Sequence, residues 1–165
     1  MRKVVLLIIA LLLVGAGILL IAPTANAAVC PTGWGSLQKT NGASSLGNIT
    51  AVRAGRNECY DRLVFDVNGT PPGYSVRYVS TVFAEGTGNP LPVTGGAKLE
   101  VVIRSLSDTA RMPSVAGFQT FRSVVYGGSF EGQTTVGLGV RARLPFRVFI
   151  LTNPSRVVVD VAHKW

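Results

Sequence analysis

The sequence has 165 residues, with 16 Lys and Arg against 8 Asp and Glu, a formal net charge of +8 and 47% hydrophobic residues. This length favours one folded domain behind an N-terminal export segment. One histidine and two cysteines are too few to favour a zinc site.

The N-terminus predicts export. Arg2 and Lys3 precede 18 residues without a charged or strongly polar side chain, Pro23 then breaks the helix, and residues 25–27 form a small-x-small site. We expect residues 1–27 to be a signal peptide. An uncleaved membrane anchor is the alternative, because the apolar run reaches the lower limit for spanning a bilayer. Both interpretations place the rest of the chain outside the cytoplasmic membrane, secreted or associated with the envelope.

The charge of the exported part is also informative. Without Arg2 and Lys3, 14 basic and 8 acidic side chains remain, a net charge of +6. A basic exported domain is attracted to anionic wall polymers or lipid headgroups. The alternative is that this moderate charge only keeps the protein soluble.

The two cysteines, Cys30 and Cys59, predict one disulfide, because an even count in an oxidising compartment indicates pairing. The closed loop of about 30 residues is worth about 3–4 kcal/mol. The bond would tie a Gly/Ser-rich arm, residues 28–47, to the folded domain.

Beyond the arm, short β-type runs alternate with Gly, Pro and Asn turns, and no stretch has a sustained helical period. Residues 105–119 are irregular, with room for one helical turn, and 127–129 looks like the turn of a hairpin. Gly137 and Gly139 lie opposite apolar residues of their strand, which indicates a bulge or close backbone approach. We expect an all-β sandwich or barrel over residues 48–165. The expected strands are 49–53, 60–67, 74–83, 98–104, 120–126, 134–141, 146–151 and 156–162.

Two of these strands carry the same motif. Residues 61–67 and 155–161 share the form Arg-apolar-Val-apolar-Asp-Val. Antiparallel pairing would set Arg62 against Asp160 and Arg156 against Asp66. Two interpretations stay open: cross-strand ion pairs that fix the register, or arginines that face a ligand.

An Arg-x-Val-x-Asp strand near each end of an all-β domain resembles the AMIN domain, and the closer resemblance is to the AMIN-like proteins of actinobacteria. The resemblance covers residues 52–163. The matching residues are Val52-Arg53, Gly55, Tyr60–Asp66, Pro72–Tyr74, Val76, Tyr78-Val79, Gly95, Ala97, Leu99–Val101, Phe130–Gly132, Gly137–Gly139, Phe146–Val148 and Pro154–His163.

The resemblance implies a β-sandwich of two roughly symmetrical sheets in the cell envelope. AMIN domains target amidases and secretion components there, in part by binding peptidoglycan. This sequence carries no amidase or secretin module, so a targeting role has no evident cargo. The resemblance places Arg62 and Arg156 at motif positions.

Catalytic groups are scarce in the sequence. His163, the one histidine, lies near the C-terminus, where we expect a partly exposed strand end, and no Gly-x-Ser-x-Gly elbow supplies a nucleophile. Asp66 with Asp160 is the candidate glycosidase-type pair, yet each has an arginine suited to neutralise it. We therefore expect a protein that is not an enzyme and needs no cofactor or metal.

Binding is the remaining class of function. Basic and aromatic residues are interleaved at Arg122 with Tyr126 and around Arg147, although ordinary solvated arginines would give the same pattern. The working hypothesis is a non-catalytic wall-associated domain that binds peptidoglycan or an anionic wall polymer through Arg62, Arg156, Arg122, Tyr126 and Arg147. The alternative is a structural domain that binds an envelope protein. We expect no nucleic-acid partner and membrane contact only through the N-terminal segment.

Overall fold

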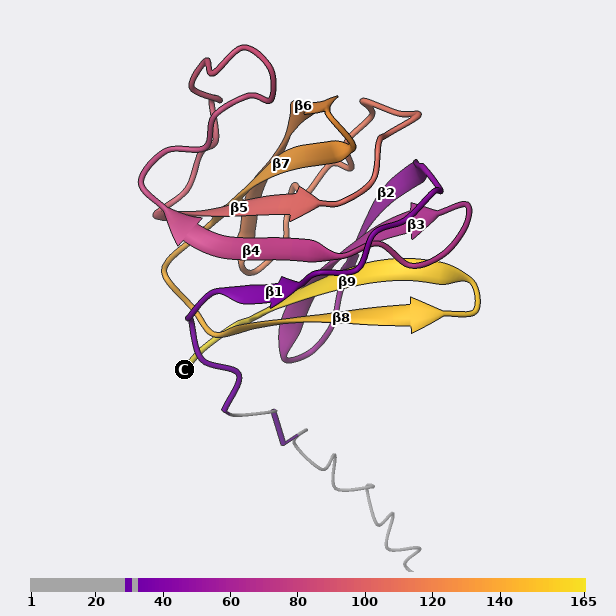
Figure 1. The fold of residues 1–165 in the computed structure, drawn as a ribbon. Helices are drawn as coiled ribbons and strands as arrows, with labels where there is room; N and C mark the ends of the chain where they lie inside the picture. The colour runs from indigo at the N-terminus through magenta and orange to yellow at the C-terminus, as the bar shows by residue number, and fades with distance from the viewer. Residues whose placement is uncertain (1–28, 31–32) are drawn as a thin grey trace, which may run out of the picture.

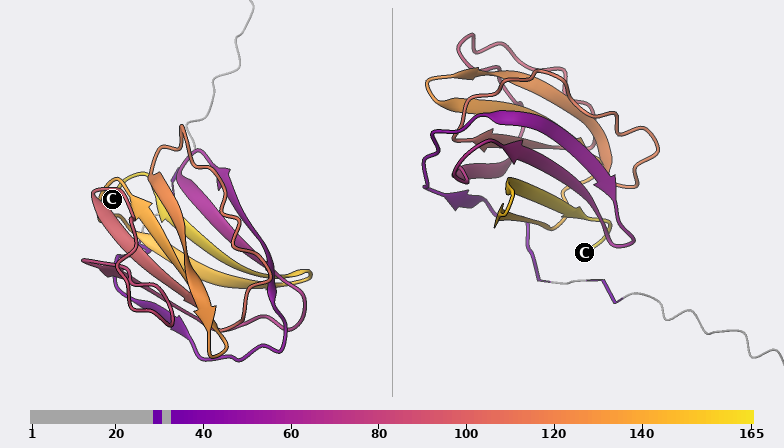
Figure 2. Two further views of the ribbon diagram at one scale, coloured as in Figure 1. Left: turned by 90° about the horizontal axis from the view of Figure 1, so that it is seen from above. Right: turned by 90° about the vertical axis from the view of Figure 1, so that its right-hand side faces the viewer.

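The computed structural model describes residues 29–30 and 33–165, which form two antiparallel sheets around one core (Figures 1 and 2). The prediction of an all-β fold is confirmed, while the predicted N-terminal helix lies outside the described residues. No helix long and apolar enough to cross a bilayer occurs in the described part. One sheet has the order β1-β4-β5-β7-β6 and the other β2-β3-β9-β8. The strands are β1 (Lys39–Asn41), β2 (Ile49–Arg56), β3 (Tyr60–Val67), β4 (Tyr74–Val79), β5 (Ala97–Ile103), β6 (Phe121–Phe130), β7 (Gln133–Val140), β8 (Phe146–Thr152) and β9 (Ser155–Ala162).

The core forms because alternate residues of each strand point between the sheets. Leu63 and Phe65 of β3 are fully buried, and so are Leu99 and Val101 of β5 in the opposite sheet. Each such side chain contributes about 1.5–3 kcal/mol by leaving water. The alternation therefore leaves the other residues of each strand on the outer faces of the sandwich.

The two motif strands are neighbours. β3 pairs with β9, and the register sets Arg62 opposite Asp160 and Asp66 opposite Arg156. The predicted antiparallel pairing is confirmed. It joins the beginning and the end of the domain at the centre of the four-stranded sheet.

Three strand ends differ from the sequence prediction by three residues or more, among them that of β2, which was expected at residue 53 and lies at Arg56. β6 continues through the expected turn at 127–129, where it has a bulge, and the hairpin reverses at Glu131 and Gly132, both with positive φ. Two successive positive φ values match the twist of a two-residue hairpin, which explains why the reversal lies there. β4 ends at Val79, four residues before its predicted end at 83, and Val82 packs over Gly137.

The segment 80–96 covers the outer face of the five-stranded sheet at β6 and β7. A Cβ atom at Gly137 would overlap the side chain of Val93, and one at Gly139 would overlap the carbonyl oxygen of Thr94. Val93 is buried by this contact. The predicted close backbone approach is confirmed, and the two glycines are there because the covering segment leaves no room for a side chain.

The N-terminal arm is held at three places. The Cys30–Cys59 disulfide is formed as predicted. The Phe146 amide at the start of β8 donates to the carbonyl of Gly35 (2.9 Å), and the arm then forms β1, which pairs with β4 (Figure 1). The arm was predicted without a strand, because its Gly/Ser-rich composition shows no β alternation. It crosses from the edge of one sheet to the edge of the other.

His163 corrects another prediction, because it is buried, with 6% of its surface exposed. Its Nδ1 lies 3.1 Å from the Glu58 carbonyl oxygen and its Nε2 3.2 Å from a carboxylate oxygen of Asp61. The other oxygen of Asp61 accepts hydrogen bonds from the amides of Thr120 (2.6 Å) and Phe121 (2.9 Å). Asp61 thus joins β3 to the C-terminus and to the start of β6.

We expect Asp61→Ala to lower the free energy of unfolding by about 3 kcal/mol, because it leaves two buried amides without acceptors. Urea unfolding followed by circular dichroism measures this. Glu131→Gln at an exposed turn is the control and should change stability by less than about 0.5 kcal/mol. Equal effects of the two substitutions would contradict this role of Asp61.

Candidate functional site

The outer face of the four-stranded sheet presents its side chains in rows, because the registers of β2, β3, β9 and β8 align them. The first row is Gly55, Arg62, Asp160 and Arg147; the second is Arg53, Val64, Val158 and Phe149; the third is Ala51, Asp66, Arg156 and Leu151. Four arginines and two aspartates give this face a net charge of +2. The outer face of the sheet that contains both motif strands is therefore cationic.

Two arginines share one buried carboxylate in the first row. Arg62 donates from Nε to Oδ1 of Asp160 (2.7 Å) and from Nη2 to Oδ2 (2.9 Å), and Arg147 donates from Nε to Oδ2 (2.8 Å). The Asp160 side chain is fully buried, whereas those of Arg62 and Arg147 are 29% and 38% exposed. The two guanidinium groups therefore cover the carboxylate and are held in place by it.

Aromatic rings surround these guanidinium groups. The Cζ atom of Arg147 lies 4.4 Å from the ring centroid of Trp34 and 5.0 Å from that of Phe149. The Cζ atom of Arg62 lies 5.1 Å from the ring centroid of Tyr60. These distances are in the range of cation–π attraction. We call Trp34, Tyr60, Arg62, Arg147, Phe149 and Asp160 the arginine–aromatic cluster.

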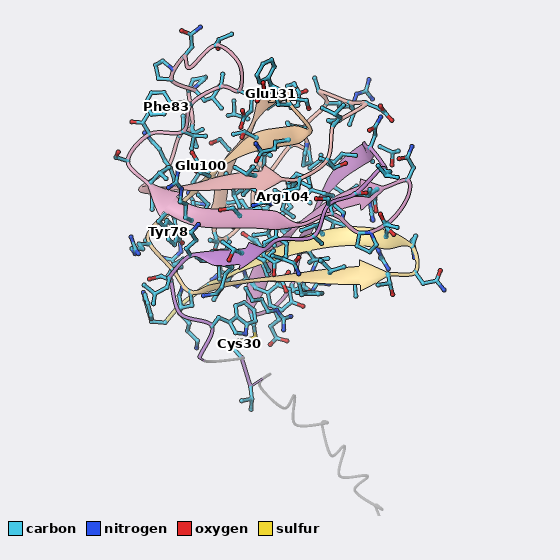
Figure 3. All side chains as sticks on the ribbon, in the orientation of Figure 1. Cys30, Tyr78, Phe83, Glu100, Arg104 and Glu131 are labelled. Carbon is cyan, nitrogen blue, oxygen red and sulfur yellow. A yellow bond between two sulfur atoms is a disulfide. The ribbon has the colours of Figure 1, made fainter. Side chains whose placement is uncertain are left out.

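The cluster lies at the end of the sandwich where the arm enters. Trp34 belongs to the arm, and Tyr60 follows the disulfide-bonded Cys59 directly. Figure 3 shows Cys30 at this end and Phe83 and Glu131 at the opposite end of the view. The disulfide thus brings an aromatic ring of the arm onto the arginine row.

The pKa values of two arginines on this face are raised by their aspartate partners. Hydrogen bonding to Asp160 raises the pKa of Arg62 above its ordinary value, although partial burial acts in the opposite direction. Hydrogen bonding to Asp66 likewise raises the pKa of Arg53. Both hydrogen bonds therefore favour the charged form of the arginine.

The second predicted ion pair is not formed. Asp66 accepts hydrogen bonds from Nε (2.5 Å) and Nη2 (2.7 Å) of Arg53 on β2, and Arg156 donates instead to the Pro154 carbonyl oxygen (3.2 Å). Ala51 lies opposite Asp66 on β2 and is small, so Arg53, its diagonal neighbour, can reach the carboxylate. The prediction that Arg156 pairs with Asp66 is wrong, although the register is right.

The remaining predicted site residues lie elsewhere. Arg122 is exposed on β6 of the other sheet and donates to the carbonyls of Phe118 and Phe121. Tyr126, also on β6, donates to the hydroxyl of Ser129 (3.2 Å). The structure therefore brings Arg62 and Arg147 together, leaves Arg156 two rows away on the same face, and separates Arg122 and Tyr126 from them.

Sequence reasoning missed Trp34 and Phe149 as members of the site. Phe149 is two residues after Arg147 and shares its face by strand alternation, so the period-2 pattern could have found it. Trp34 has no comparable signal, because its place depends on the disulfide and on the path of the arm.

The geometry does not assemble the candidate pair of catalytic acids. Asp66 and Asp160 lie two rows apart, about 13 Å along the strands. Glycosidase carboxyl groups lie about 5–9.5 Å apart, and each of these aspartates is bound by arginine. No group of three metal-ligating side chains occurs in residues 29–30 and 33–165.

Surface hollows are found away from the cluster. One of about 320 Å³ lies beside Arg104 and Glu131, and another of about 320 Å³ lies between Tyr78 and Arg143. Neither is lined by a residue of the arginine–aromatic cluster. The cluster itself lies on the outer face of the four-stranded sheet.

We expect Arg62 and Arg147 to be energetically coupled through Asp160. Arg62→Gln or Arg147→Gln alone leaves the buried carboxylate one arginine, whereas the double variant leaves it none. The loss of unfolding free energy in the double variant should exceed the sum of the single losses by about 1–3 kcal/mol.

Urea unfolding of the four proteins in this cycle measures the coupling. Arg53→Gln with Arg147→Gln is the matched control, because these arginines bind different carboxylates, and their effects should add to within about 0.5 kcal/mol. Additive losses for Arg62 and Arg147 would rule out the shared carboxylate as the source of stability.

The disulfide should hold Trp34 in the cluster. We expect Cys30→Ala/Cys59→Ala to lower the unfolding free energy by about 3 kcal/mol and to shift Trp34 fluorescence to longer wavelength as the ring enters water. Trp165→Phe in both backgrounds leaves Trp34 as the one tryptophan. Unchanged emission would show that the arm stays in place without the bond.

Comparison with known proteins gives one match. A family model described as AMIN-like domain matches residues 47–163, more than half of the chain. No curated protein and no solved structure matches.

Proposed function

Because this chain belongs to the AMIN-like domain family, we propose that it is an exported domain that binds peptidoglycan or an anionic wall polymer through the outer face of its four-stranded sheet. At the family level, AMIN-like domains are cell-wall-associated and non-catalytic. To this description of the family, the proposal adds the surface that binds, which is the outer face of the four-stranded sheet, and the kind of ligand that it binds.

The arginine–aromatic cluster is the observation that carries this proposal. A wall polymer offers sugar rings, which stack on aromatic faces, and carboxylates or phosphates, which guanidinium groups bind. The cluster presents both kinds of partner side by side, in Trp34, Tyr60 and Phe149 with Arg62 and Arg147. Because Asp160 already fixes both arginines, a ligand does not have to order them, and binding costs less entropy.

The proposed location agrees with the covalent structure. The Cys30–Cys59 bond is consistent with an oxidising compartment outside the cytoplasm. Residues 1–27 serve in this proposal as a signal peptide or an uncleaved anchor, residues 28–47 as the arm, and residues 48–165 as the wall-binding domain. The arm then acts as more than a spacer, because it supplies Trp34.

Co-sedimentation of the exported protein, disulfide intact, with purified peptidoglycan tests the proposal. We expect pelleting at low salt that weakens at about 0.15 M salt, where exposed charges are screened beyond about 8 Å. Arg62→Gln should weaken binding about tenfold, because charge-assisted hydrogen bonds contribute about 1.5–3 kcal/mol. Circular dichroism confirms that each variant is folded.

Arg122→Gln is the matched control, since it removes an exposed arginine from the opposite sheet. It should pellet like the unsubstituted protein. No pelleting at either salt concentration would refute wall binding and direct the search toward an envelope protein partner. Equal losses in Arg62→Gln and Arg122→Gln would show that only net charge matters.

A further inference from the structure

A hollow of about 320 Å³ lies in the five-stranded sheet where β4 ends and β5 begins. Tyr78, labelled at the left in Figure 3, forms part of its wall. Lys98 and Arg143 also line the hollow, and no acidic residue does. Ligand sites have volumes of about 300–1,000 Å³, so this hollow has room for a small ligand about the size of one sugar ring.

Arg143 is held beside the hollow by neutral groups. Its Nε and Nη2 groups donate to the hydroxyl and the carbonyl oxygen of Ser36 on the arm (3.2 Å each), and its Cζ atom lies 4.9 Å from the ring centroid of Tyr78. The Tyr78 hydroxyl accepts from the amide of Leu144 (2.9 Å) and donates to its carbonyl oxygen (2.8 Å). The guanidinium group is therefore fixed in position, and its Nη1 group has no hydrogen-bond partner among the described residues.

Lys98 brings the second charge from β5. Its Nζ donates to the carbonyl oxygen of Ser80 (3.2 Å), and Ser80 also lines the hollow, so the ammonium group lies at the wall. An ammonium group has three donors, and Ser80 takes one of them. Glu100, the next residue of β5 on the same face, accepts instead from Arg77 of β4 (2.7 Å). Lys98 therefore keeps donors for a ligand.

The charges of Lys98 and Arg143 are not neutralised within the described part of the chain. Four other arginines each form an ion pair with an aspartate or a glutamate, whereas neither of these two cations does. Two cations beside one hollow repel each other, and an anion bound there relieves the repulsion. Carboxylate and phosphate groups accept charge-assisted hydrogen bonds from both kinds of side chain.

We propose that this hollow is an anion site, in which Lys98 and Arg143 bind one carboxylate or phosphate group of a small ligand. The site goes beyond the proposed wall binding, because it contains no residue of the arginine–aromatic cluster and needs no polymer. Arg143 is positioned before the ligand arrives, so binding does not have to order its side chain.

Titration of the isotope-labelled exported protein, followed by NMR, tests the site with one probe of each chemistry. The probes are inorganic phosphate and N-acetylmuramic acid, both as sodium salts at low ionic strength. We expect a saturable shift of the amide signals of residues 78–80, 96–98 and 143 with at least one of them. Sodium chloride should weaken the binding, because exposed charges are screened. N-acetylglucosamine, the same sugar ring without the lactyl carboxylate, is the matched ligand control and should shift none of these signals.

Lys98→Gln removes one charge and leaves the contacts of Arg143 with the arm in place. It should fold normally and bind the anion about tenfold more weakly. Arg143→Gln should weaken binding at least as much. Arg122→Gln is the matched control, because Arg122 is also held by carbonyl oxygens but lies on β6 and does not line the hollow. This variant should bind like the unsubstituted protein, and circular dichroism checks the fold of each variant.

The outcomes decide the site without reference to wall binding. A saturable shift with either anion that Lys98→Gln weakens supports the site, and the tighter of the two probes names the ligand class. No saturable shift with either anion, equal shifts with N-acetylglucosamine, or equal weakening by Arg122→Gln would overturn it. Because peptidoglycan takes no part in these titrations, a failure of the pelleting experiment leaves the anion site standing.

Discussion

The pairing of Arg62 with Asp160 is the interaction on which the arrangement of this face depends. Asp160 is fully buried on the outer side of β9, where an unpaired carboxylate would be costly. Arg62 and Arg147 bring the compensating charge from the strands on either side. The contact joins residues 98 positions apart, so it fixes the register of the central pair of strands as well as the position of the two guanidinium groups.

The two outer faces of the sandwich differ in what covers them. The chain's own segment 80–96 lies over the five-stranded sheet, and Gly137 and Gly139 have no side chain because that segment occupies the space. Gly55 on the four-stranded sheet has no side chain either, yet nothing lies within 4 Å of a Cβ there. The same residue type thus reflects internal packing on one face and open space beside an arginine on the other.

The arm links stability to the proposed site. Its disulfide, its hydrogen bond to β8 and its strand β1 bridge the two sheets, and between these contacts it sets Trp34 against Arg147. The cluster is therefore complete only when the arm is in place. Trp34 belongs to the arm and not to a strand of the four-stranded sheet. The composition of this face therefore depends on a segment whose sequence resembles a linker.

The sequence by itself determined the β class, the limits of β3, the disulfide and the β3–β9 register, because period-2 alternation, two cysteines and equal Arg-to-Asp spacing are local signals. Only the tertiary structure decided that Asp66 binds Arg53, that His163 is buried against Asp61, and that Trp34 and Phe149 surround the arginines. These contacts depend on which side chains lie close to one another in space. Those distances are decided only when segments far apart in the chain pack together.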